Sequence, residues 1–212
     1  YFHPPVDLSQ FFIRQRFNNP IRVKWENAKN TENRKHDYIQ HAGVDLTPNP
    51  DAKDLNAYSI FDGKIVKIIK NGEEDHGLGN SVIIEFDNKL CDFEKDLCKK
   101  FNKIYALYAH LESINPDLKE NLFIKKGEII GKVGATGYGC NYWRIGDDGC
   151  NKTSPLDTHL HLEIKTSPVL ESPLPASCFV NGSYKNCYGY TPNNPENYGY
   201  INPINFLFQL NK

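Results

Sequence analysis

Three short segments of this 212-residue chain carry side chains that could together hold a metal ion. His41 and Asp45 stand four residues apart on either side of a glycine, and His159 and His161 stand two apart. Side chains two apart in a strand point to the same side, so the second pair faces one space. His110 adds a further imidazole in an aromatic segment. Imidazole and carboxylate ligands suit Zn²⁺, and a catalytic zinc has three protein ligands and one position for water.

Each of these segments also has a simpler interpretation. A lone His-x-His fits two partly exposed strand residues, and His110 alone fits a hydrogen-bonded core histidine. The combination is more specific, because four of the seven histidines fall in these three segments. If His159 and His161 both bound the metal, the site would have four protein ligands and no room for water, which is typical of a structural zinc.

Other catalytic chemistries have little support in the sequence. The glycine-rich stretch 131–137 lacks the Gly-Lys-Ser/Thr ending of a phosphate loop and opens no expected helix, so it predicts a tight turn. There is no Gly-x-Ser-x-Gly nucleophile elbow. Metal-assisted hydrolysis is therefore the chemistry that the residues favour.

Short alternating apolar runs predict the strands that carry these side chains. They cover residues 64–69, 81–86, 104–111, 128–133 and 158–164, which favours a mostly β, antiparallel fold. Strict alternation along 104–111 puts Tyr108 and His110 on the same face. We expect residues 1–30 to form an N-terminal arm packed on the core, with a short helix near residues 8–16, and residues 31–212 to form the main domain.

Composition narrows the classes of protein further. The 25 basic and 26 acidic side chains give a net charge of -1, which argues against a nucleic-acid partner. No apolar run approaches the roughly 18–20 residues of a membrane-spanning helix. The chain has no Met, so we expect a leader or start region to precede it. The sequence predicts a monomer that is secreted, periplasmic or on the cell surface.

Three long insertions, near residues 87–102, 138–157 and 167–197, each carry two cysteines. None of the six lies in a Cys-x-x-Cys pair, and their even number indicates an oxidising compartment. We expect sequential disulfides that staple each loop, each contributing roughly 2–3 kcal/mol. The expected pairs are Cys91–Cys98, Cys140–Cys150 and Cys178–Cys187.

Taken together, the motifs resemble those of the lysostaphin/LytM-type zinc endopeptidases. Residues 41–45 resemble the family's His-x-Gly-x-Asp segment, 108–111 its Tyr-x-His-Leu signature, and 159–163 its His-Leu-His-Phe-Glu segment. Segments 57–66, 77–84, 126–137 and 201–207 match in the same order. The resemblance covers about residues 38–207 apart from the three insertions.

This resemblance implies a fold, a reaction and a set of residue roles. The fold would be an antiparallel β-sheet with a groove, and the reaction would be peptide-bond hydrolysis by a zinc-activated water, in peptidoglycan stems or cross-bridges. His41, Asp45 and His161 would hold one zinc ion. His110 and His159 would be the catalytic pair.

Several alternatives stay open at this point. Tyr108 is expected to orient or bind substrate beside His110. A non-catalytic zinc-binding recognition module on the same scaffold is the main alternative to an enzyme. A D,D-carboxypeptidase is a further one, although such enzymes space their first two ligands more widely. The sequence does not give the cleaved bond, the general base, or whether residues 1–30 inhibit the site.

Overall fold

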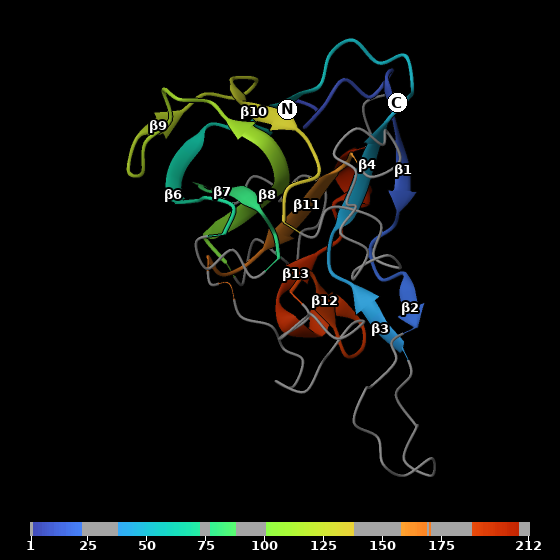
Figure 1. Cartoon of the computed structure of the whole chain (residues 1–212). Coiled ribbons are helices and arrows are strands. Elements are labelled where there is room, and N and C mark those ends of the chain that lie inside the picture. Colours follow the sequence, from blue (N-terminus) through green and yellow to red (C-terminus); the bar gives the residue numbers. More distant parts are fainter. Residues whose placement is uncertain are drawn as a thin grey trace, which may run out of the picture.

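A computed structural model of the chain describes residues 2–22, 38–72, 77–87, 101–137, 158–168, 170 and 188–207. Within these ranges the fold is mostly antiparallel β-structure, as the sequence predicts (Figure 1). All six cysteines and the proposed boundary at residue 30 lie outside the described residues, so the disulfides and the domain division stay predictions. No helix in the described part is long and apolar enough to cross a membrane.

The larger sheet carries Asp45, His161 and His110 on three neighbouring strands. Its strands follow one another in the order β1 (Phe11–Gln15), β4 (Val44–Pro48), β11 (Leu160–Lys165), β8 (Lys103–Ile114), β7 (Asn80–Asp87), β6 (Gly63–Ile69) and β9 (Phe123–Ile124). β10 (Ile129–Val133) pairs with β8 and β5 (Asn56–Tyr58), and β13 (Tyr200–Ile201) pairs with β11.

A smaller sheet beside it has the order β12 (Tyr190–Thr191), β3 (Tyr38–His41) and β2 (Pro20–Arg22). Helical structure in the described part is limited to a short 3₁₀ turn, Pro195–Tyr198, and α2 (Ile204–Leu207). The predicted strands at 64–69, 81–86, 104–111, 128–133 and 158–164 correspond to β6, β7, β8, β10 and β11.

Strand alternation gives the larger sheet two different faces. Leu160, Leu162 and Ile164 of β11 have no exposed surface and join the main hydrophobic core. The intervening positions of the same strand carry His161, Glu163 and Lys165, which are also buried. The second face is therefore polar along β11, although little of it is open to water.

The N-terminal residues form a strand where a short helix is expected near residues 8–16, so that prediction is wrong. β1 pairs antiparallel with β4, with Phe11 opposite Pro48 and Ile13 opposite Leu46. Phe11 is buried and Phe12 is exposed, which is the two-residue period of a strand. Phe2 also joins the main core. Pairing with β4 satisfies the backbone of this segment and outweighs the local sequence signal.

The sequence predicts that His110 shares a face with Tyr108, but a bulge in β8 separates the two residues. Val82 of β7 pairs with Tyr108, while Asn80 pairs with Leu111, so one extra residue of β8 lies between these two pairs. His110 occupies the bulge with a φ of 62°, in the left-handed region that a non-glycine residue rarely adopts. Tyr108 and Leu111 consequently both face the main core.

Tyr108 therefore does not share a face with His110, and its side chain lies in the main core. The phenol has no exposed surface, and its oxygen accepts a hydrogen bond of 3.1 Å from the Ile60 N–H. Burial, only partly offset by that hydrogen bond, raises the pKa of Tyr108 far above its usual value. The side chain thus links β8 to the turn before β6.

Replacing Tyr108 with phenylalanine should lower the free energy of unfolding by about 1–3 kcal/mol, because the buried Ile60 N–H loses its acceptor. Tyr105→Phe on the same strand is the matched control, since that hydroxyl donates to Glu85 in a partly exposed contact. It should cost about 0.5–1 kcal/mol. Denaturant unfolding measures both. A Tyr108→Phe chain of unchanged stability that loses hydrolytic activity would restore the substrate-binding role.

Candidate metal centre

The three residues predicted to bind metal come together from three strands. Asp45 pairs directly with His161 across β4 and β11, and His41 ends β3 just before the turn into β4. His41 Nε2 lies 3.0 Å from His161 Nδ1 and 3.2 Å from Asp45 Oδ1, and His161 Nδ1 lies 2.9 Å from Asp45 Oδ1. All three side chains are buried, and their nearest atoms form a group that could hold a metal ion.

The size of this triangle fits a tetrahedral zinc site. Zinc–nitrogen and zinc–oxygen bonds of about 2.0–2.1 Å give tetrahedral edges of roughly 3.3 Å. The three measured edges of 2.9–3.2 Å are close to that length. Two imidazoles and one carboxylate are also ligands that zinc takes in proteins. The residues present therefore fit the metal that the sequence predicts.

Gly43, between His41 and Asp45, is required by this close approach. A Cβ on Gly43 would lie 2.6 Å from the Leu162 carbonyl oxygen and 2.9 Å from His161 Cε1. Both separations are shorter than a normal contact, so any side chain here would move β11 or the His161 ring. Steric crowding thus explains why a glycine is required at this position of the His-x-Gly-x-Asp pattern.

His41 and His161 each have one ring nitrogen held by an acceptor outside the triangle. His41 Nδ1–H donates to the Arg16 carbonyl at 3.2 Å, and His161 Nε2–H donates to Glu163 Oε1 at 3.1 Å. In neutral rings with those nitrogens protonated, the lone pairs of His41 Nε2 and His161 Nδ1 are directed at the same space. The acceptors therefore favour the tautomers that can bind a metal.

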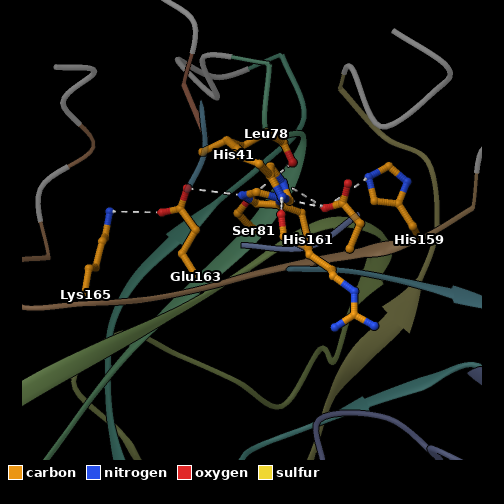
Figure 2. Close-up of polar contacts among 9 residues, drawn as sticks. His41, Leu78, Ser81, His159, His161, Glu163 and Lys165 are labelled. Carbon is orange, nitrogen blue, oxygen red and sulfur yellow. Dashed lines mark hydrogen bonds and ion pairs between the residues drawn. The ribbon is translucent and has the colours of Figure 1, made fainter. Parts of the chain in front are cut away.

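His110 and His159 lie beside the triangle and outside it. Their ring centroids are 4.8 Å apart, and His159 Nε2 lies 3.9 Å from Asp45 Oδ1 (Figure 2). His110 Nδ1–H donates to the Thr136 carbonyl at 2.9 Å, which leaves its Nε2 free. The structure thus brings together all five residues that the sequence singles out for metal binding and catalysis, while Tyr108 faces the core.

Burial and neighbouring charges set the protonation of the group. Burial alone would raise the pKa of Asp45, but His41, His159 and the hydrogen bond from His161 hold it well below its usual value. Burial, together with the neighbouring His159 and His161, holds the pKa of His110 well below its usual value. Asp45 is therefore an anion and His110 a neutral imidazole at neutral pH.

His161 has the opposite shift. Burial by itself would lower the pKa of His161, but its hydrogen bonds with Asp45 and Glu163 raise it to about 9. These two carboxylates make the ring more basic. A metal ion bound at Nδ1 would replace the proton on that nitrogen.

Some residues of the site are not singled out by the sequence analysis. Glu163 and the Arg16 carbonyl hold the two ligand rings. The Gly189 carbonyl accepts from the Ala42 N–H, and the Tyr190 ring centroid lies 5.6 Å from that of His41. Strand alternation along 159–165 is a signal that could have identified Glu163. The contacts of Arg16 and Gly189 depend on the tertiary fold and have no local signal.

Comparison with known proteins finds matches only among solved structures. No family model and no curated protein matches the sequence. The catalytic domain of the antimicrobial peptidase lysostaphin from Staphylococcus simulans is 19% identical, with a TM-score of 0.46, over 93% of this chain and 92% of that chain. A zinc-containing peptidase from Vibrio cholerae is 24% identical, with a TM-score of 0.43, over 76% of this chain and 35% of that chain.

A chain of the SpoIIQ–SpoIIIAH pore-forming complex is 18% identical, with a TM-score of 0.49, over 96% of this chain and 88% of that chain. This chain thus spans about a third of the Vibrio cholerae peptidase and most of the other two chains.

Gly43→Ala should weaken zinc binding and lower the free energy of unfolding by about 1–3 kcal/mol, because the added methyl overlaps Leu162 O and the His161 ring. Gly72→Ala is the control. A Cβ there has nothing within 4 Å, but the φ of 86° costs about 1–2 kcal/mol of stability. Competition with a chromogenic chelator, with denaturant unfolding in parallel, separates the two effects. Wild-type zinc affinity in Gly43→Ala would contradict the geometry described.

Proposed function

We propose that the protein is a zinc metalloendopeptidase that hydrolyses peptide bonds in peptidoglycan stems or cross-bridges. The observation that carries this proposal is the buried triangle of His41 Nε2, Asp45 Oδ1 and His161 Nδ1, with two further histidines beside it. Three ligands leave a fourth position free, which is typical of catalytic zinc rather than structural zinc. His159 stands outside the triangle, which supports the three-ligand assignment.

When bound, zinc supplies Lewis-acid activation of water and of the scissile carbonyl. The protein's own task is to move protons and stabilise charge. As the water oxygen bonds to the carbonyl carbon and the C–N bond breaks, a proton must pass from the water to the leaving amine. A neutral imidazole can carry that proton. His110, with its free Nε2, and His159 are the candidates.

The remaining histidine of this pair would stabilise the developing negative charge on the carbonyl oxygen. An imidazole N–H that is already held in place offers such a hydrogen bond without reorganisation. The Thr136 carbonyl and the bulge in β8 set the orientation of His110, and its single N–H is taken by that carbonyl. A neutral His110 can therefore accept a proton at Nε2, and it could serve as the oxyanion donor only when both of its nitrogens are protonated. The two histidines can cover both proton transfer and oxyanion binding, and which ring has which task stays open in this proposal.

The sequence motifs support the proposed substrate, and the cysteine content supports the proposed location. The segments at 41–45, 108–111 and 159–163 resemble those of wall-acting endopeptidases, which supports peptidoglycan as the substrate. Six cysteines fit an oxidising compartment and hence a secreted, periplasmic or surface protein with disulfides. A net charge of -1 gives no reason to expect binding to nucleic acid.

Digestion of purified cell walls tests the reaction itself. The zinc-loaded chain should release new amino and carboxyl termini from muropeptides of known cross-link chemistry, identified by mass. Stoichiometric zinc without hydrolysis of any wall type would favour the recognition module instead. Release of terminal D-Ala alone would indicate a carboxypeptidase.

Alanine variants of His161, His159 and His110 should separate metal binding from catalysis. His161→Ala should lose both zinc and activity, since it removes one of three ligands. His159→Ala should keep zinc near one ion per chain and lose perhaps 10²–10⁴ of the rate, the usual scale for a positioned proton-transfer group. His110→Ala should behave like His159→Ala.

Atomic absorption after exhaustive dialysis measures the zinc content of the three variants. Circular dichroism confirms that each is folded. If His159→Ala loses its metal as readily as His161→Ala, the site has four protein ligands and is structural, and the proposal fails.

A further inference from the structure

One face of β11 carries a row of polar residues that leads away from the metal group. His161, Glu163 and Lys165 alternate with Leu160, Leu162 and Ile164, which lie in the main core. Figure 2 shows the row as a chain of contacts from His161 to Glu163 to Lys165. All three polar side chains are buried, with 2–5% of their surface exposed. Metal binding directly involves only the first of them.

The contact between His161 and Glu163 determines which ring nitrogen is available for metal. His161 Nδ1 lies 2.9 Å from Asp45 Oδ1, within the ligand triangle, and Nε2 lies 3.1 Å from Glu163 Oε1. A neutral imidazole carries its proton on one nitrogen only, and the ring can bind metal only through the other. A carboxylate has no proton to donate, so Glu163 accepts from Nε2–H and leaves Nδ1 free.

Lys165 places a positive charge beside the buried Glu163 carboxylate. Its Nζ lies 3.6 Å from Glu163 Oε2, on the oxygen opposite the one that accepts from His161. A buried carboxylate is costly without a compensating charge, and lysine is rarely buried unless it is paired. Lys165 is thus the cation paired with this carboxylate, on the side away from His161.

We propose that Glu163 is a positioning residue that fixes the tautomer and orientation of His161 for metal binding, and that Lys165, paired with the other oxygen of this carboxylate, compensates its buried charge. This inference rests on the proposed function only in taking zinc as the metal. It adds an orienting pair to the three ligands. Acceptors of this kind on a ligand histidine typically change metal affinity or activity 10–100-fold.

Zinc affinity of the full chain, measured by chelator competition, tests the role of Glu163. Glu163→Ala should bind zinc 10–100-fold more weakly than the wild type. Glu163→Gln keeps an oxygen that can accept from Nε2–H but lacks the charge, so its loss should be smaller. Glu85→Gln, which removes a carboxylate paired with Lys103 on the same sheet, should leave the affinity unchanged.

A spectroscopic readout separates positioning from general damage. In the zinc-loaded wild type, the His161 Nε2 proton should give a downfield resonance that exchanges slowly with water. The resonance should move upfield in Glu163→Gln and be lost in Glu163→Ala, while it is unchanged in Glu85→Gln. Circular dichroism identifies a variant that does not fold, and Glu163→Gln then decides alone.

A double variant tests the separate part assigned to Lys165. Lys165→Met leaves the Glu163 charge without its lysine and should lower the melting temperature. Glu163→Gln/Lys165→Met removes both charges, so it should recover melting temperature relative to Lys165→Met while zinc affinity stays at the level of Glu163→Gln. No recovery in the double variant would contradict the charge-compensating role.

The results also separate this inference from the proposed function. Wild-type zinc affinity and an unshifted His161 resonance in both Glu163 variants would overturn the positioning role, even if the chain hydrolyses peptidoglycan. Weaker zinc binding in those variants would support the role, even if no wall substrate is cleaved. A wild-type chain that binds no zinc would overturn both.

Discussion

The pairing of β11 with β4 on one side and β8 on the other is the constraint on which the whole site depends. It places His161 opposite Asp45 in one direction and opposite Ala109 in the other. These strands are far apart in the sequence, so the ligand triangle exists only when the sheet has formed. Metal binding and folding are therefore expected to stabilise each other.

Two irregular features complete the geometry that regular strands cannot supply. The bulge in β8 turns His110 out of the core face and towards His159, at the cost of a left-handed backbone. The N-terminal segment passes beside β4 and brings the Arg16 carbonyl to His41. Residues 11–16 are thus part of the framework of the candidate site, because the Arg16 carbonyl holds the His41 ring.

The sequence could predict the elements and the group of side chains, since both depend on local patterns. Alternation identified five strands, the spacing in 41–45 and 159–161 grouped the candidate side chains, and the family resemblance implied which of them would bind metal. It could not predict the face of His110, because the bulge is set by the register with β7 and leaves no sign in the alternation. The same limit explains Tyr108, which strict alternation placed beside His110.

The N-terminal strand illustrates a second limit. The apolar residues near Phe11 fit a helix or a strand equally well in a short window, and pairing with β4 decides between them. Glu163 lay within a recognised motif, yet its role depends on the 3.1 Å contact with His161. Contacts of this kind require the fold to be known.

The measurement that tests the central claim most directly is X-ray absorption at the zinc edge of the zinc-loaded chain. The account predicts one zinc with a first shell of nitrogen and oxygen only, at about 2.0–2.1 Å, including the outer-shell scattering of two imidazoles. A sulfur shell at about 2.3 Å would place the metal on cysteine. A third imidazole would make His159 or His110 a ligand. Either result would contradict the assignment of His41, Asp45 and His161 as the metal-binding residues.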